Sequence, residues 1–459
     1  MTDAVETVPP RRMPSLALIL VAGSAITAVS LGVRATFGLF LAPVTEALQT
    51  DRAGFALAIA IQNLIWGFGQ PVAGAVADRF GAPRVLAAGG VLYTVGVFGM
   101  SQSTSTTGLY LTGGLVVGLA MAAASFAVVL AAVGRIAPPE RRTSAMGIVT
   151  AAGSVGQFLL VPTAGRLEDA LGWRSALATL GAVALVVVAV APVLRERHRG
   201  TPGAAPAAAP FRPALRRALR HPSYLLLCAG FFVCGFHVTF IGTHLPAYLR
   251  DVGLSKGTGA TAVALIGLFN IGGSLAAGRM AGRFAKNRLL SVIYGARAVA
   301  MVALVLLPHT PTTALVFGAV MGVLWLSTVP LTSGIVVGQF GVANAGTLFG
   351  VVFLAHQLGA FIGVWYGGWL ADATGSYVSV WWLAVALGVF AAVINLFVSD
   401  APAPPAPERA VASSGLGAGA GVASVLVLAS VSAYGAAGVR PDEADVPLPV
   451  PYCVIHPTA

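Results

Sequence analysis

The sequence predicts an all-α integral membrane protein in which twelve transmembrane helices form two pseudo-symmetric six-helix bundles. Three observations support this prediction: a very apolar composition, twelve apolar runs of bilayer-spanning length, and an internal repeat that relates the two sets of six runs. Of the 459 residues, 57% are hydrophobic and 9% are charged, against about 25% charged in soluble domains. So few charges cannot keep a soluble surface of this size hydrated, and we therefore expect a lipid bilayer around most of the chain.

Twelve apolar runs are separated by short stretches that contain charges, prolines and polar clusters. Each run approaches the roughly 20 residues that one helix needs to cross a bilayer. The runs are 15–41, 54–77, 85–101, 108–133, 144–165, 175–194, 223–248, 259–281, 289–307, 313–337, 346–369 and 378–398. The first run follows two arginines but is longer than a signal-peptide core, so we interpret it as a retained span.

The basic residues predict the orientation of the chain in the membrane. Most of the 27 Lys and Arg lie in segments on the same side as the N-terminus, and the loops on the other side hold five of them. Basic residues favour the cytoplasmic side, so we expect a multi-pass protein of a bacterial-type inner (plasma) membrane with a cytoplasmic N-terminus. The net charge of +11 is then a topology signal, and nucleic-acid binding is excluded because no soluble domain presents the arginines.

The polar stretch 195–222 divides the twelve runs into six and six. We therefore predict an N-terminal tail at 1–14, bundles at 15–194 and 223–398, a basic cytoplasmic linker at 195–222, and a Pro/Ala/Gly-rich extension at 399–459. Within the extension, 415–439 is either a poorly ordered tail or a thirteenth span. The segment GAVADRFGAPRVL from Gly74 recurs as GRMAGRFAKNRLL from Gly278, which indicates an internal duplication like that of transporters whose halves rock about a central site.

The first copy of this repeat resembles the signature loop of the major facilitator superfamily. Its matching residues are Gly74, Asp78, Arg79, Gly81 and Arg84. With the twelve runs and the second copy, the resemblance covers 15–398 and implies the major facilitator fold. It also implies that this motif is a conformational gate, because a carboxylate near a helix end can pair with an arginine of a neighbouring helix in one state.

Three local patterns resemble the monocarboxylate and oxalate/formate exchanger branch of that superfamily. They are the segments RATFGLF from Arg34, WLSTVPLT from Trp325 and HQLGAFIG from His356. The branch is expected to carry an Asp and an Arg in span 8, where this chain offers Asn270. The resemblance implies transport of a small organic anion, in particular a monocarboxylate, with a proton as a candidate second cargo.

The charges inside the spans are positive. None of the 16 Asp and Glu lies near the middle of a run, whereas Arg34 lies about seven residues before the end of run 1. A buried guanidinium without an acid can bind a carboxylate in a bidentate pair. Arg34 is therefore our main candidate for the substrate site, and the alternative is an arginine that extends to the interface or to backbone carbonyls. We expect Arg297 in run 9 to extend towards the inner interface.

Other candidate substrate contacts are polar or aromatic side chains within the spans. Histidine as a residue type can change its charge in the physiological pH range and suits proton-linked anion transport, which makes His237 and His356 candidates. His237 also occupies the repeat position of Arg34, so we expect these two residues to face each other. Each candidate could instead bond between helices. The remaining candidates are Asn63, Gln157, Asn270, Trp325 and Gln357. The histidine spacing and the three Cys give no metal site or disulfide framework, and we expect no cofactor.

Together these features predict a monomeric secondary transporter that works by alternating access and uses gradients, since no phosphate-binding Gly-Lys-Ser loop occurs. One alternative is an exporter of drugs or other hydrophobic compounds, which needs only an apolar cavity. However, such exporters of cations usually keep a carboxylate in the membrane. A second alternative, a membrane-embedded enzyme or receptor, lacks a carboxylate dyad, an activated nucleophile or a metal cluster in the spans.

Overall fold

The computed structural model describes residues 15–138, 142–195 and 211–402. These residues belong to one unit of the chain, 1–404. The predicted tail 1–14 and the segment 415–439 lie outside the described residues.

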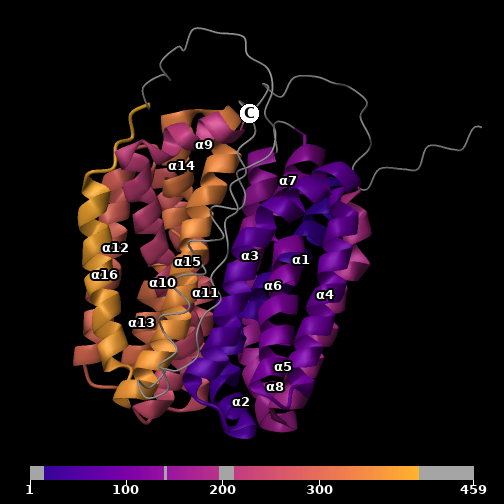
Figure 1. Ribbon diagram of the computed structural model, residues 1–459, viewed down its shortest axis with the longest axis vertical. Helices are drawn as coiled ribbons and strands as arrows, with labels where there is room; N and C mark the ends of the chain where they lie inside the picture. The colour runs from indigo at the N-terminus through magenta and orange to yellow at the C-terminus, as the bar shows by residue number, and fades with distance from the viewer. Residues whose placement is uncertain (1–14, 139–141, 196–210, 403–459) are drawn as a thin grey trace, which may run out of the picture. The chain divides into compact units, whose positions relative to one another are not determined.

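Helices make up almost all of the described chain (Figure 1). In the N-terminal half they are α1 (Leu16–Ala35), η1 (Phe37–Phe40), α2 (Leu41–Leu48), α3 (Arg52–Phe80), α4 (Ala82–Gln102), α5 (Thr106–Leu109), η2 (Tyr110–Val116), α6 (Val117–Ala123), α7 (Phe126–Ile136), α8 (Arg142–Val190) and η4 (Ala191–Leu194). Then follow α9 (Phe211–Leu219), α10 (Pro222–Asp251), α11 (Lys256–Met280), α12 (Lys286–Leu306), α13 (Pro311–Leu324), α14 (Thr328–Phe340), α15 (Val342–Thr374) and α16 (Val378–Leu396).

Eleven helical segments of the described chain are long and apolar enough to cross a membrane. One of them, Ala145–Leu194, has 50 residues, and at 1.5 Å per residue it extends about 75 Å, enough for two crossings. It bends at Gly172, whose φ of 77° and ψ of 163° are not helical. Because Gly172 lies between the predicted runs 144–165 and 175–194, the segment accounts for two of the twelve crossings, and the predicted all-α fold is confirmed.

Two spans differ from their predicted form. The first continues beyond residue 41 through η1 and α2, so that it comprises Leu16–Leu48. The tenth is interrupted at Trp325–Ser327, between α13 and α14. Pro43 and Pro330 lie in the first turns of α2 and α14, where a missing backbone N–H costs no intrahelical bond. Each proline therefore restarts a helix and does not end the span.

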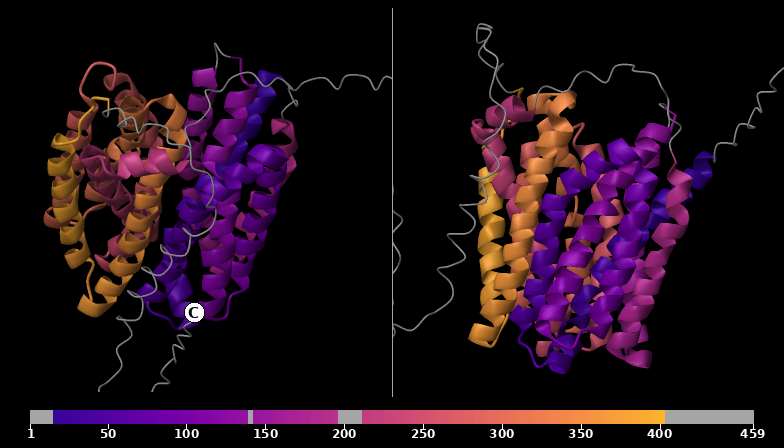
Figure 2. Two further views of the ribbon diagram at one scale, coloured as in Figure 1. Left: turned by 45° about the horizontal axis from the view of Figure 1, so that its top comes forward. Right: turned by 45° about the vertical axis from the view of Figure 1, so that its right-hand side comes forward.

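The helices pack in two groups, which we call the N-terminal half (α1–α8) and the C-terminal half (α10–α16). In the first, α1, α4 and α7 pack against α8, and α3 packs against α6; in the second, α10 packs against α15, α11 against α13, and α12 against α16. The halves meet mainly where α3 contacts α15 and α8 contacts α11, and we call this four-helix contact the seam. At the Arg52 end, η1 and α2 also contact α10. Figure 2 shows the two groups from two further directions.

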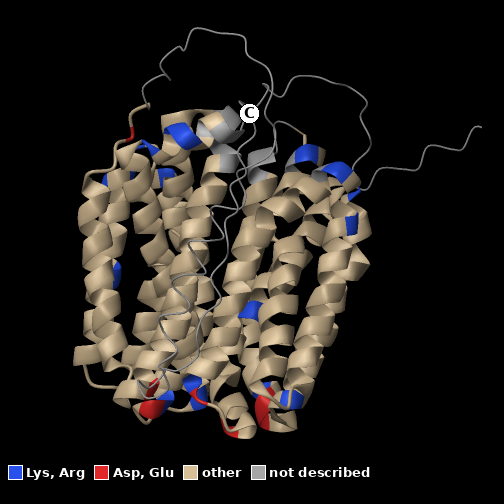
Figure 3. Ribbon diagram, viewed as in Figure 1, with Lys and Arg blue, Asp and Glu red and all other residues tan. Residues whose placement is uncertain are grey.

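The helices have two distinct ends. We call the end at which α9 lies the linker end, and the opposite end, at which α3 begins, the Arg52 end (Figure 1). Charged residues gather at the two ends and are rare between them (Figure 3). Basic residues predominate at the linker end, whereas both signs occur at the Arg52 end. Several spans begin with a polar N-cap residue. At the start of α3, for example, Asp51 Oδ1 accepts a hydrogen bond from the Gly54 N–H at 2.7 Å.

Candidate functional site

Arg34 lies near the middle of the first span. Because the span continues to Leu48, Arg34 is 14 residues from its end and not about seven as predicted, which corresponds to roughly 20 Å at helical rise. Its Nη2 donates a hydrogen bond to Asn63 Oδ1 of α3 at 2.5 Å, while its buried Nε has no partner. None of the ion pairs recorded among the described residues includes Arg34. The guanidinium therefore keeps unused donor capacity and uncompensated charge.

The partner of Arg34 also connects the two halves. Asn63 is fully buried, its Nδ2 donates to the Ile59 carbonyl at 2.7 Å, and its own carbonyl accepts a bond from Gln357 Nε2 of α15 at 3.1 Å. His356 Nδ1 lies 3.1 Å from Gln357 Oε1, and since that oxygen can only accept, Nδ1 carries the proton. Four predicted site residues, Arg34, Asn63, His356 and Gln357, are thus brought together across the seam.

Aromatic rings enclose this group. The Arg34 guanidinium carbon lies 5.3 Å from the centroid of the Trp66 ring, a cation–π distance. Trp66 meets Phe353 edge to face at 5.4 Å, and Phe353 stacks on His356 at 5.7 Å. We call these six residues, three from each half, the Arg34 group: Arg34, Asn63, Trp66, Phe353, His356 and Gln357.

Three other predicted site residues form a second group around α11, which contacts both α8 and α13. Gln157 Nε2 donates to the Val263 carbonyl of α11 at 2.9 Å. Asn270 Nδ2 donates to Ser154 Oγ of α8 at 2.8 Å, and Asn270 Oδ1 accepts a bond from the Leu326 N–H at 3.0 Å. Trp325 is buried at the interruption of the tenth span. These residues bond mainly between helices, which is the alternative that the sequence left open.

His237 is separated from the Arg34 group. It is fully buried, and its Nε2 donates to the Ala384 carbonyl of α16 at 2.8 Å, away from the seam. Its Nδ1 is buried without a partner. The expected pairing across a pseudo-twofold axis therefore does not occur, because this face of α10 packs against α16.

Arg297 also differs from the expectation that it extends to the interface. Its side chain is completely buried, and it donates bonds to the carbonyls of Leu324 and Trp325. The ring of Tyr294 lies 5.3 Å from its guanidinium carbon. A charge in a bilayer is costly, and here the freed carbonyls at the interruption of the tenth span compensate it.

The predicted gate motif lies at the linker end, where α3 ends and α4 begins. Gly81 has a φ of 91°, a conformation that a side chain would strain. Arg84 Nη1 donates to the Phe80 carbonyl at 3.1 Å, and Arg79 lies over the Phe80 ring. Gly74 faces open space, because a Cβ placed there would meet no atom within 4 Å. The side chain of Asp78 lies outside the described part of the structure.

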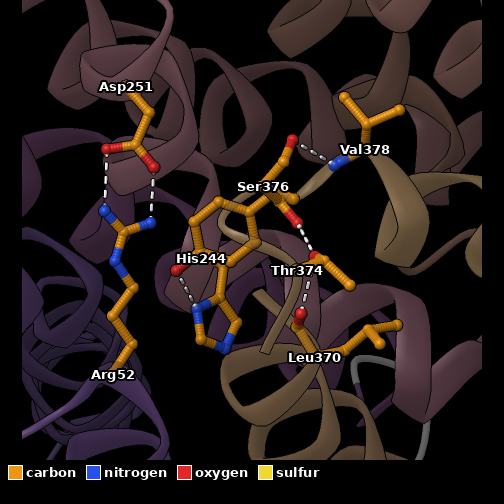
Figure 4. Close-up of polar contacts among 8 residues, drawn as sticks. Arg52, His244, Asp251, Leu370, Thr374, Ser376 and Val378 are labelled. Atoms are coloured by element: carbon orange, nitrogen blue, oxygen red, sulfur yellow. Dashed lines mark hydrogen bonds and ion pairs between the residues drawn. The ribbon is translucent and has the colours of Figure 1, made fainter. Parts of the chain in front are cut away.

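At the Arg52 end, charged groups join the two halves (Figure 4). Arg52 of α3 makes a bidentate pair with Asp251 of α10, with Nη2 to Oδ1 at 2.8 Å. Its guanidinium carbon also lies 5.0 Å from the centroid of the Tyr377 ring. Asp372 of α15 accepts a bond from the Ala53 N–H at 2.8 Å. Lys256 of α11 pairs with Glu168 at 2.9 Å and with Asp169 at 2.8 Å, both in α8.

Tyr377 and His244 support this cluster from the C-terminal half. His244 Nε2 lies 2.9 Å from the Val364 carbonyl, so this nitrogen carries the ring proton, and Nδ1 accepts the Tyr377 hydroxyl at 2.9 Å. Burial raises the pKa of Tyr377 above its ordinary value, so the hydroxyl keeps its proton for that bond. The ring that Arg52 contacts is thereby held in place.

Contact between the halves extends from the Arg52 end to the middle of the seam. A Cβ at Gly165 of α8 would lie 3.7 Å from the Ala260 Cβ of α11, and in mid-seam a Cβ at Gly67 would lie 2.8 Å from the Gln357 Cβ. Towards the linker end, each of the four seam helices has a glycine that faces open space. A Cβ added at any of these glycines would meet no described atom within 4 Å: Gly74, Gly147, Gly278 and Gly350. For the described residues, these positions indicate a seam that is closed at the Arg52 end and open at the linker end.

Sequence reasoning did not single out Trp66, Phe353 or the charged cluster at the Arg52 end. Trp66 follows Asn63 by three residues and Phe353 precedes His356 by three, so each shares a helix face with a predicted site residue. That spacing could have identified both aromatic residues. Arg52, Asp251 and Lys256 occur in different loops, and nothing in the sequence indicates which loops meet.

Two halves that meet along a seam, with polar side chains at mid-membrane depth, form an architecture that is typical of secondary transporters. The chain belongs to the Major Facilitator Superfamily, because the family model matches residues 23–364. It is 25% identical to monocarboxylate transporter 13 of Bos taurus over 82% of this chain and 88% of that protein. It is 24% identical to the MFS-type transporter YcxA of Bacillus subtilis over 79% of this chain and 90% of that protein.

Among solved structures, a bacterial homolog of the human lysosomal transporter Spinster has the same fold. Its TM-score to this chain is 0.69 at 16% sequence identity, over 84% of this chain and 97% of the other. The protein is thus a multi-pass membrane transporter with bacterial relatives, and the resemblance to the superfamily found in the sequence is confirmed.

Proposed function

We propose that the protein moves a small organic anion, in particular a monocarboxylate, across the membrane by alternating access. The observation that carries the proposal is the Arg34 guanidinium, which lies near mid-span and has, among the described residues, no partner for its Nε and no ion pair. A carboxylate that replaces Asn63 Oδ1 as acceptor gains a charge-assisted pair of about 1.5–3 kcal/mol. The names of the mammalian relatives, monocarboxylate transporters, support the same cargo.

The rocking of the halves is supported by the uneven seam. Contacts at the Arg52 end include ion pairs with partly exposed side chains, so their separation exposes groups that water can solvate. The Arg34 group bridges the halves at mid-seam through the bond from Gln357 to Asn63. An anion that binds Arg34 displaces the Asn63 side chain from the guanidinium, and the backbone carbonyl of Asn63 accepts the bond from Gln357. Occupancy of the site is thereby linked to the contact between the halves.

The orientation and the proton are further parts of the proposal. The linker end is cytoplasmic, since basic residues predominate there (Figure 3), and the protein resides as a monomer in a bacterial-type inner membrane. The gate motif around Asp78 then acts on the cytoplasmic side, at the open end of the seam. His356 is the proposed proton carrier, because it lies in the Arg34 group and an imidazole has two ring nitrogens that can hold or release a proton.

Uptake into proteoliposomes tests the cargo. Labelled monocarboxylates should enter with saturable kinetics, whereas their uncharged amide analogues should not. Arg34→Gln should lower the initial rate at least about tenfold, as expected from the loss of about 1.4 kcal/mol or more. The matched control is Arg288→Gln, which alters an exposed arginine of α12 away from the seam. Saturable uptake that survives Arg34→Gln unchanged contradicts the anion site, and export of hydrophobic cations in its place supports a drug exporter.

An inward proton gradient tests the role of His356. The gradient should accelerate monocarboxylate uptake by wild-type protein, and His356→Gln should abolish this acceleration while exchange of anion for anion persists. If the acceleration survives in His356→Gln, another group carries the proton.

A further inference from the structure

The interruption of the tenth span frees backbone groups within the protein. Between α13 and α14, Trp325–Ser327 is not helical, so carbonyls and N–H groups near it lack their usual intrahelical partners. Such groups at membrane depth must find partners inside the protein. Two of these backbone carbonyls find hydrogen-bond donors locally. The Val329 N–H donates to the Leu326 carbonyl at 3.0 Å, and Ser327 Oγ donates to the Val323 carbonyl.

Two side chains from neighbouring helices supply the remaining partners. Arg297 of α12 donates from Nε and Nη2 to the Leu324 carbonyl, at 3.2 and 2.8 Å, and from Nη2 to the Trp325 carbonyl. Asn270 of α11 accepts the Leu326 N–H at 3.0 Å. The guanidinium thus binds the freed acceptors and the amide binds the freed donor. Arg297 has 0% exposure and Asn270 has 5%, so water does not compete for these bonds.

Asn270 carries this arrangement across the seam. Its Oδ1 binds Leu326, and its Nδ2 donates to Ser154 Oγ of α8, in the other half, at 2.8 Å. The two bonds use the two ends of one planar amide, so a movement of either partner reorients the group for the other. Ser274 Oγ, on the same helix as Asn270, donates to the same oxygen at 3.1 Å without reaching the other half.

We propose that Asn270 and Arg297 are positioning residues that couple the interruption of the tenth span to the opening of the α8–α11 seam. When the seam closes, Ser154 fixes the Asn270 amide, which holds the Leu326 N–H, while Arg297 holds the carbonyls on the other side of the interruption. When the seam opens and Ser154 leaves, the amide is free to turn and the interruption loosens. The proposal rests on the alternating-access part of the proposed function and is independent of the identity of the cargo.

Hydrogen exchange at the interruption, measured by mass spectrometry on peptides that contain Leu326, tests the coupling without any substrate. A disulfide between Gly165→Cys and Ala260→Cys locks the seam, because the Cβ separation of 3.7 Å matches disulfide geometry. The native thiols are replaced by Cys228→Ala, Cys234→Ser and Cys453→Ala. The locked protein should exchange at Leu326 at least about fivefold more slowly than the same protein after reduction. Equal rates in the two forms would overturn the proposal.

Matched variants assign the effect to the amide. Ser154→Ala should remove most of the difference between the locked and reduced forms, while Ser274→Ala, which removes the bond on the same helix, should leave it. Arg297→Lys, which keeps the charge but not the planar fork of donors, should accelerate exchange at the interruption in both forms. If the difference persists in full in Ser154→Ala, Asn270 does not transmit it and the proposal fails. Because no cargo is added, neither result depends on whether Arg34 binds an anion.

Discussion

The two ends of the seam are built from different interactions. At the Arg52 end the halves are joined by ion pairs, with Arg52 bound to Asp251 and Lys256 bound to Glu168 and Asp169. At the linker end, glycines of all four seam helices face open space. The middle is joined by neutral amides, such as Gln357 and Asn63. The difference indicates that ion pairs help to hold the Arg52 end closed, where water can solvate the charges when the seam opens. In the apolar middle of the membrane, the halves are joined by hydrogen bonds between neutral groups.

The largest effect should come from disulfides placed at the two ends of α8 and α11. In protein without native thiols, Gly165→Cys with Ala260→Cys should cross-link almost completely and stop transport until reduction, because their Cβ atoms are at bonding distance. The matched pair Gly147→Cys with Gly278→Cys lies at the linker end of the same helices. Its two thiols should not form a disulfide in unliganded protein. Gel mobility before and after reduction measures both pairs. Equal cross-linking at the two ends would show that the seam is not closed at one end and open at the other.

A smaller effect is expected from neutralising the bidentate pair. Asp251→Asn removes the negative charge that pairs with Arg52. An exposed ion pair of this kind contributes about 1 kcal/mol or less. Its loss should therefore make opening of the seam up to about fivefold more frequent. The reactivity of an Ala260→Cys reporter, buried in wild-type protein at 5% exposure, towards a water-soluble thiol reagent measures the opening.

The exchanged pair Arg52→Asp with Asp251→Arg serves as the control for this prediction. It should restore only part of the protection, since the contact of Arg52 with the Tyr377 ring is lost. Unchanged reactivity in Asp251→Asn would mean that the ion pair does not hold the end closed.

The smallest effect should follow the loss of one acid of the second cluster. Asp169→Asn leaves Glu168 as the partner of Lys256, and the Asp169 side chain is 68% exposed while that of Glu168 is 8% exposed. We expect less than about a twofold rise in reporter reactivity, and it should vanish at high salt because exposed charges are screened. Glu168→Gln, the matched variant, should have the larger effect. The reverse ranking would show that burial does not decide the strength of these pairs.

The fold could be predicted from the sequence because the bilayer imposes it. Span length, apolarity and the placement of arginines follow from the thickness of the membrane and the charge cost of crossing it. Arg34, Asn63, His356 and Gln357 were found for the same reason, since polar side chains within apolar runs need an explanation. The interruption of the tenth span was not predicted. Pro330 lies close to it, but a proline alone does not show where the freed carbonyls find donors.

Contacts between distant segments could not be predicted. Arg297 was expected to extend to the inner interface, yet its side chain donates to the carbonyls of Leu324 and Trp325. His237 was placed opposite Arg34 by the repeat offset, but a repeat fixes the helix and not the direction of a side chain on it. The pairing of Arg52 with Asp251 depends on which loops meet, and loop sequences carry no such information.

Equilibrium binding of a radiolabelled monocarboxylate to purified wild-type, Arg34→Lys and Arg34→Gln protein tests the central claim most directly. Wild-type protein should bind the carboxylate, Arg34→Lys should bind it several-fold more weakly, and Arg34→Gln should bind it about thirtyfold or more weakly, the equivalent of about 2 kcal/mol for a charge-assisted pair. The uncharged amide analogue should bind all three proteins equally weakly. Carboxylate binding by Arg34→Gln that is as tight as that of the wild type would contradict the account.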